Sequence, residues 1–212
     1  MKLICISDTH SLHEHMPSIP DGEVLIHAGD CTGSGSLSAL DEFTKWFRSL
    51  PHSHKILIAG NHDFCFEKQP TESRRMCEER GITYLRGESI AIGGVNFYGF
   101  PWQPIYRFMA FNAREGELKG RLKLVPDNTN VLVSHGPALN TLDYIPSEGA
   151  HVGCRALAKR IEQLPNLKAH ICGHIHESYG LLVRESDGLK CVNASTCTED
   201  YKPSNTPIII DL

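Results

Sequence analysis

The sequence lacks the features that would place the protein in a membrane or on a long nucleic acid. No apolar run among its 212 residues approaches the roughly 18 that a membrane helix requires, and no secretory signal core follows Met1. We therefore expect a cytoplasmic protein without a membrane partner. Basic residues are also scarce, since 21 Lys and Arg are outnumbered by 25 Asp and Glu and the net charge is −4. That balance argues against long DNA or RNA as a partner.

Cysteine motifs for metal binding are also absent. None of the eight cysteines forms a CxxC pair, and Cys5 and Cys172 fall inside apolar runs that are typical of buried strands. We therefore expect free, reduced cysteines in the core rather than disulfides or a cysteine-bound zinc ion. Internal repeats, low-complexity tracts and linkers are missing as well. Because the length suits one hydrophobic core, we predict one domain over residues 1–212.

Short apolar runs alternate with helical patterns in the first 60 residues, which predicts parallel strands and an α/β fold. Ser38 and Asp41 resemble a capping box at the start of the first helix, and Pro51 ends it. Gly81 is typical of a helix C-terminus. Helices are predicted at 38–50, 70–80 and 154–164, hairpins at 89–98 and 180–193, and a closing strand at 207–211.

Five of the apolar runs end on side chains that can bind a divalent metal ion, and this pattern is the most informative one in the sequence. Open α/β sheets bind ligands just past the carboxyl ends of such strands, so the five ends should converge in one cleft. Carboxylate, amide and imidazole groups suit hard or borderline divalent ions. The side chains at these ends are Asp8, His10, Asp30, Asn61, His62, Asp63, His135, His174 and His176.

The spacing of these residues supports one shared site. Asp8 and His10 are two positions apart, as are His174 and His176, so both members of each pair face the same side of an extended segment. Two divalent ions about 3.5 to 4 Å apart need a carboxylate between them, and Asp30 is the candidate for that bridge.

The same blocks resemble the five-block signature of the calcineurin-like metallophosphoesterases. Residues 99–104 and 193–197 further resemble the small metallophosphoesterase-domain-containing proteins first described from brain tissue, and their bacterial relatives. The resemblance implies a four-layer α/β/β/α sandwich of two mixed sheets around a dinuclear metal centre. The matching blocks are Asp8-Thr9-His10, Gly29-Asp30, Gly60-Asn61-His62-Asp63, His135-Gly136 and Gly173-His174-Ile175-His176.

The resemblance also implies the ligands of each ion. One ion would be held by Asp8, His10, Asp30 and His176, and the other by Asp30, Asn61, His135 and His174. Mn²⁺ is the favoured metal, with Fe, Zn²⁺, Ni²⁺ and Mg²⁺ left open. A metal-bound hydroxide would then attack the phosphorus of a phosphate ester in line with the leaving oxygen.

Two further residues are assigned to the chemistry of this hydrolysis. His62 follows Asn61 and is predicted to act as the general acid on the leaving-group side. Asp63 is predicted to orient the His62 ring and to favour its imidazolium form.

The type of ester is inferred from neighbouring positions. Protein phosphatases of similar sequence carry arginines beside the Gly-Asp and Gly-Asn-His blocks, whereas this chain has Cys31, Thr32 and Ala59 there, which favours a phosphodiester. Seven of the sixteen aromatic residues lie between positions 97 and 111. Trp102 and Tyr106 are the candidates for stacking on a substrate base, so a (cyclic) nucleotide is the favoured substrate.

Alternative functions stay open. The first is a phosphomonoesterase that acts on a small molecule, and the second is a binding module that keeps the fold but has lost the chemistry. An oligomer contact or a hydrophobic cap would also explain the aromatic segment. The long irregular segment 137–152 starts beside a predicted ligand, and we expect it to form a wall or lid of the site.

Overall fold

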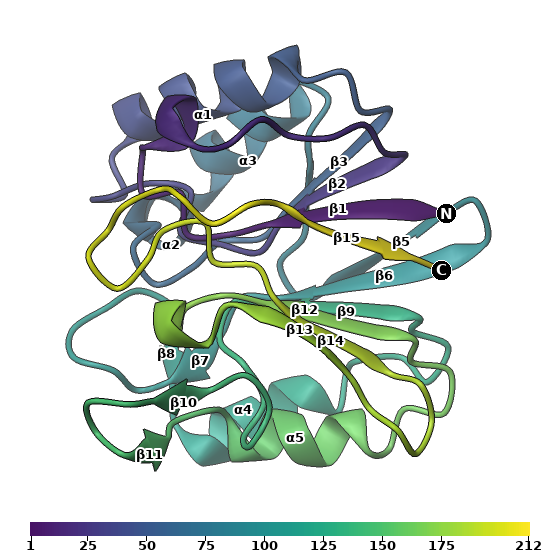
Figure 1. The fold of residues 1–212 in the computed structure, drawn as a ribbon. Coiled ribbons are helices and arrows are strands. Elements are labelled where there is room, and N and C mark those ends of the chain that lie inside the picture. The colour runs from purple at the N-terminus through teal and green to yellow at the C-terminus, as the bar shows by residue number, and fades with distance from the viewer.

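Two large mixed sheets face each other in the computed structural model, which describes residues Met1 to Leu212. The first sheet has the order β15-β1-β2-β3-β4, with β1, β2, β3 and β4 parallel and β15 antiparallel to β1. The last strand therefore closes the sheet beside the first (Figure 1). The strands are β1 (Lys2–Ile6), β2 (Val24–His27), β3 (His54–Leu57), β4 (Thr83–Tyr84) and β15 (Ile208–Asp211).

The second sheet has the order β13-β14-β12-β9-β6-β5. Its four central strands are parallel, and each edge strand folds back as the antiparallel arm of a hairpin. Its strands are β5 (Glu88–Ile92), β6 (Val95–Phe100), β9 (Val131–Ser134), β12 (Ala169–Cys172), β13 (Gly180–Val183) and β14 (Lys190–Asn193). Two small pairs lie outside the sheets: β7 (Gln103–Pro104) with β8 (Asn112–Ala113), and β10 (Tyr144–Ile145) with β11 (Ala150–His151).

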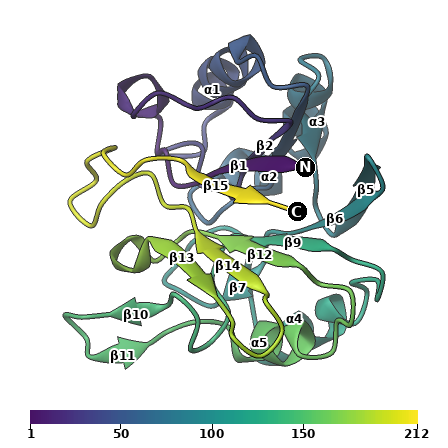
Figure 2. The same cartoon turned by 45° about the vertical axis from the view of Figure 1, so that its right-hand side comes forward.

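Helices cover the outer face of each sheet, which gives four layers (Figures 1 and 2). The first sheet is covered by α1 (Leu37–Ser49), α2 (Phe64–Lys68) and α3 (Pro70–Glu78), and the second by α4 (Glu115–Leu122) and α5 (Arg155–Ile161). Short 3-10 turns lie at His13–His15 and His176–Ser178. None of the helices combines the length and apolar character needed to cross a membrane.

Side chains that alternate between the two faces of each strand pack into three apolar clusters. In β1, Leu3 and Cys5 belong to the cluster between the sheets, while Ile4 and Ile6 pack in the cluster under α1, α2 and α3. A third cluster fills the space between the second sheet and α4 and α5. Because the central strands are buried on both faces, their sequences are continuous apolar runs. The sandwich therefore matches the predicted α/β/β/α architecture.

Several local predictions are confirmed and one helix start is corrected. Both hairpins and the closing strand are present, and all eight cysteines are free and buried. The first helix is capped by Ser36, whose side chain accepts a hydrogen bond from the backbone N–H of Ala39. Ser38 thus lies inside the helix, because Ser36 already has the extended backbone that a capping residue needs. Helices α2 and α4 were not predicted.

Candidate metal centre

The predicted ligands converge at the carboxyl ends of strands from both sheets. Asp8 and His10 follow β1, Asp30 follows β2 and Asn61 follows β3, while His135 follows β9 and His174 and His176 follow β12. Three overlapping groups of titratable side chains have their ligand atoms within 4.8 Å of one another. These groups are Asp8, His10 and His176; His10, Asp30 and His62; and Asp30, His135 and His174.

One end of the centre is formed by Asp8, His10 and His176. The Nε2 atom of His176 lies 3.4 Å from Asp8 Oδ1 and 3.4 Å from His10 Nε2. These separations are too long for strong hydrogen bonds between the pairs, and they suit donors that surround a common ion. All three side chains are largely withdrawn from solvent.

The other end is formed by Asn61, His135 and His174, with Asp30 between the two ends. His135 Nε2 lies 2.8 Å from Asn61 Oδ1 and 3.4 Å from Asp30 Oδ2. The same Asp30 oxygen lies 3.9 Å from His10 Nε2 at the first end. Asp30 Oδ2 thus lies between an imidazole of the first end and an imidazole of the second.

Hydrogen bonds to backbone carbonyls orient two of the imidazoles. The Nδ1 atom of His135 lies 3.0 Å from the carbonyl of Ala28, and the Nδ1 atom of His176 lies 2.9 Å from that of Thr198. Because a carbonyl only accepts, each Nδ1 must carry the proton and donate it. When the ring is neutral, its unprotonated Nε2 faces the centre and can bind a metal ion.

Asp8 provides the clearest test of whether a cation fits. Its Oδ2 accepts hydrogen bonds from the Ser7 and Ser195 hydroxyls and from the backbone N–H of His174, at 2.6, 2.9 and 2.9 Å. Its Oδ1 is buried and has no donor. A buried carboxylate oxygen without a partner is costly, and a divalent cation would satisfy it. The donor set fits a hard or borderline divalent ion.

Strained backbone conformations also occur at the predicted ligands. Four of the seven predicted ligands have positive φ angles: Asp8 at 50°, His10 at 44°, Asp30 at 55° and His174 at 71°. Residues other than glycine rarely adopt positive φ angles, and such backbone strain clusters at functional sites. Gly173 has a related role, because a Cβ at this position would collide with Asp8 Oδ2 and Ser7 Oγ.

The charged groups of the centre shift one another's pKa values. Burial would lower the pKa values of His135 and His176, but Asp30 and Asp8 respectively raise each of them to about 9. Burial lowers the pKa of His174 to about 3. Burial opposes ionisation of the two aspartates, but the neighbouring imidazoles hold both aspartate pKa values below the usual range. The carboxylates therefore retain negative charge that attracts cations.

Comparison with known proteins identifies the family. The family model for calcineurin-like phosphoesterases matches residues 1–178. This chain belongs to that family. Metallophosphoesterase domain-containing protein 1 of Homo sapiens is 36% identical over all of this chain and 71% of the human protein. A UPF0046 protein of Caenorhabditis elegans is 34% identical over 99% of this chain and 74% of its own length.

Solved structures share the fold of this family. A protein of Thermus thermophilus has a TM-score of 0.65 at 10% identity, covering 91% of this chain and 88% of its own. A structure described as a novel archaeal phosphodiesterase has a TM-score of 0.51 at 18% identity, covering 100% of this chain and 93% of its own. At these identities the structural likeness concerns the fold alone.

The structure corrects the role predicted for Asp63. Its buried carboxylate accepts hydrogen bonds from the Thr32 backbone and hydroxyl at 2.9 and 2.7 Å and from the Gly60 N–H at 2.8 Å, and none from His62. It therefore ties the loops after β2 and β3 together. The His62 ring is held instead by the Gly33 carbonyl, 3.0 Å from its Nδ1. The prediction that Asp63 orients His62 relied on their adjacency in the sequence, but the side chains of adjacent residues point in different directions from the backbone.

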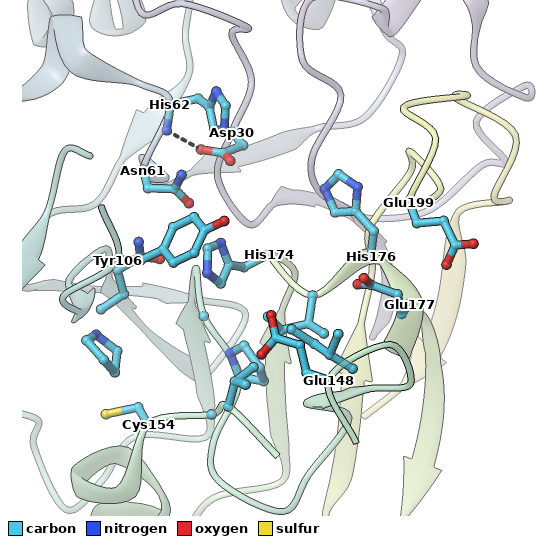
Figure 3. Close-up of a pocket in the computed structure, with 18 of the residues that line it drawn as sticks. Asp30, Asn61, His62, Tyr106, Glu148, Cys154, His174, His176, Glu177 and Glu199 are labelled. Atoms are coloured by element: carbon cyan, nitrogen blue, oxygen red, sulfur yellow. Dashed lines mark hydrogen bonds between the residues drawn. The ribbon is translucent and has the colours of Figure 1, made fainter. Parts of the chain in front are cut away.

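A pocket of about 390 Å³ opens over the calcineurin-like centre. Tyr106 lines it, with its ring 5.9 Å from that of His174 (Figure 3). Trp102 does not line it. Its indole instead packs against Arg121, 4.2 Å away, and Phe100, whose ring lies 5.5 Å away. The tertiary fold thus separates the two aromatic residues that were predicted to contact substrate.

Other lining residues were not assigned from the sequence. The segment 137–152 forms a wall of the pocket, as expected, and contributes Glu148. Glu177 and Glu199 lie on the same side of the view in Figure 3, away from Tyr106. Tyr201 has a φ of 57° and sets its ring 4.9 Å from the His10 ring. Buried Gln103 lines the pocket near Gly136. No sequence pattern marked these positions, because their packing joins distant segments.

Proposed function

We propose that this chain, acting as one domain over residues 1–212, is a phosphodiesterase that hydrolyses small phosphodiesters with two divalent metal ions. The observation that carries the proposal is the convergence of two carboxylates, one amide and four imidazoles, with Asp8 Oδ1 buried and lacking a donor. The proposed ligands are Asp8, His10, Asp30 and His176 for one ion, and Asp30, Asn61, His135 and His174 for the other.

The metal ions would supply two chemical effects when bound. They would neutralise charge on the phosphoryl oxygens and make a water molecule acidic enough to provide the nucleophile near pH 7. Mn²⁺ is the metal that we propose, because Asp, Asn and His provide a mixed oxygen and nitrogen set.

We assign proton transfer to the leaving oxygen to His62. Its Nδ1 donates to the Gly33 carbonyl, so Nε2 is the atom that is free to carry and release a proton. Its ring lies 4.7 Å from that of His10, beside the first end of the centre, and it lines the pocket. The backbone N–H of His62 donates to Asp30 Oδ1 at 2.7 Å, which couples the position of the proposed acid to the proposed bridge (Figure 3).

The charge of the pocket supports a diester over a monoester. None of its 22 lining residues is Lys or Arg, whereas Glu148, Glu177 and Glu199 add negative charge around the opening. A phosphomonoester carries more negative charge than a diester near neutral pH and would meet stronger repulsion. A nucleotide diester remains the substrate that we propose, with Tyr106 as the stacking residue.

Comparing chromogenic esters tests the proposed activity. Metal-depleted protein should be inactive and should gain activity on bis(4-nitrophenyl) phosphate when Mn²⁺ is added, with a smaller gain on 4-nitrophenyl phosphate. Metal content measured on the same samples should approach two ions per chain. Preference for the monoester would overturn the assignment as a diesterase, and metal-loaded protein without activity on either ester would favour a binding module.

A further inference from the structure

Gln103 occupies an unusual position at the edge of the pocket. It begins β7, which pairs with β8, and its backbone N–H donates to the Phe111 carbonyl at 3.0 Å. This pairing holds the backbone of the residue beside the proposed metal centre. The residue is only 1% exposed, and it lines the pocket.

The amide of Gln103 has no hydrogen-bond partner within the protein. Both Nε2 and Oε1 are buried, and neither has a donor or acceptor within reach. Most buried side-chain polar atoms in proteins are partnered, so an amide left wholly unpaired calls for an explanation. Because neither atom is engaged, the amide can turn by half a rotation and present its NH₂ group to the pocket.

Gly136 lies next to both this amide and the His174 imidazole. A Cβ added at Gly136 would lie 3.7 Å from Gln103 Cβ, 3.9 Å from Gln103 Oε1 and 3.9 Å from His174 Cδ2. A single position thus lies within contact distance of the Gln103 side chain and the His174 imidazole, so the Gln103 amide is close to the proposed metal centre.

The side-chain donors that the pocket offers to an anion include no Lys ammonium or Arg guanidinium group. The carboxylates of Glu148, Glu177 and Glu199 repel negative charge. A neutral amide N–H can hydrogen-bond to a phosphoryl oxygen without adding positive charge. Such a donor suits a diester, which carries a single negative charge, better than it suits a dianionic monoester.

We propose that Gln103 is a substrate-contacting residue whose Nε2–H donates to a non-bridging phosphoryl oxygen of the diester held beside His174. The proposal rests on the proposed function, because it takes the phosphodiester as the ligand. In this proposal, a neutral amide binds the diester phosphate, whereas an arginine would bind a phosphate of higher charge.

Substitution of Gln103 tests this role in the metal-loaded protein. Q103M removes the donor but keeps an unbranched side chain, and Q103E keeps the shape but adds negative charge. We expect kcat/KM for bis(4-nitrophenyl) phosphate to fall about 10- to 100-fold in Q103M and further in Q103E. Q163M makes the same change at exposed Gln163, outside the pocket, and should leave kcat/KM unchanged.

Thermal stability of the metal-free proteins separates recognition from a structural role. Q103M removes a buried unpaired amide, so its metal-free form should unfold at a temperature equal to or above that of the wild type. Lower activity with retained stability supports the proposal. Lower activity with a matching loss of stability, or unchanged activity in both variants, would overturn it.

Measuring the affinity for inorganic phosphate distinguishes failure of the proposed Gln103 contact from failure of the proposed activity. If the Mn²⁺-loaded wild type hydrolyses no diester, the proposed function fails, but binding of inorganic phosphate can still be measured by calorimetry. Weaker phosphate binding in Q103M than in both the wild type and Q163M would support the contact. Equal affinity in all three proteins would contradict it.

Discussion

The two sheets supply different chemistry to the centre. The first sheet carries both carboxylates and the amide, Asp8, Asp30 and Asn61, together with one imidazole. The second sheet supplies only imidazoles, His135, His174 and His176. Anionic ligands attract the cations, whereas neutral imidazoles complete the geometry. The proposed ions would therefore connect the two halves of the sandwich, with the charge coming from one half.

The largest loss of metal and activity is expected when a carboxylate of the first sheet is removed. Asp30→Asn removes the charge shared by two of the three ligand groups, so metal content should fall below one ion per chain and activity should drop to the metal-free level. Elemental analysis and diester turnover measure both effects. Asp21→Asn, at an exposed position, is the matched control. Full metal content in Asp30→Asn would refute its role as the bridge.

Removal of a ligand from the second sheet should have a milder effect on metal content. His174→Ala takes away one neutral donor and leaves the group of Asp8, His10 and His176 intact. We therefore expect about one ion per chain to be retained, with partial loss of activity. His15→Ala, at an exposed position, is the control. Equal metal loss in Asp30→Asn and His174→Ala would show that the two sheets contribute alike.

His62 belongs to the first half but is proposed to transfer a proton rather than bind metal. His62→Ala should lower kcat by about 10²- to 10⁴-fold on a diester with a poor leaving group, and less on bis(4-nitrophenyl) phosphate. Metal content should stay nearly intact. Turnover assays on esters with leaving groups of graded pKa test this dependence. An equal loss on all leaving groups would argue against a general acid.

A smaller effect concerns a buried histidine of the second sheet outside the centre. Burial lowers the pKa of His170 from 6.5 to about 4, and its Nε2 lies 2.8 Å from the Ser134 hydroxyl. As pH falls from 6.5 to 4, the unfolded chain binds a proton that the native state does not, so this histidine reduces stability. Between about pH 7 and pH 5, the unfolding free energy of His170→Gln should therefore fall by about 2 kcal/mol less than that of the wild type.

Urea unfolding of metal-free wild type and His170→Gln at the two pH values measures this difference. The ligand histidines titrate in both proteins and therefore cancel in the comparison. Identical pH dependence of the two unfolding free energies would show that His170 binds no fewer protons in the folded state than in the unfolded chain.

Local patterns predicted much of the fold. Continuous apolar runs marked the central strands, because burial on both faces leaves no place for polar residues, and turn residues marked both hairpins. Helix α4 was missed, since it offers only Leu118 and Leu122 as buried residues over eight positions. The short pairs β7–β8 and β10–β11 were missed because two-residue strands carry no periodicity.

The site was predicted unevenly for a related reason. Residues placed directly by a strand end, such as Asp8 and His174, were found because the end of a strand fixes where its side chain emerges. The partner of His62 was mistaken, and Gln103 was overlooked. Both depend on which atoms meet across loops, and the order of residues along the chain does not encode that.

The sequence by itself determined the α/β class and the set of candidate metal ligands, because strand periodicity and residue chemistry are local properties. Only the tertiary structure decided that Asp30 lies between the two ends of the centre. It also decided that Asp63 ties two loops together and that Trp102 packs outside the pocket. These outcomes depend on packing between segments far apart in the sequence, where each side chain competes for a limited number of partners.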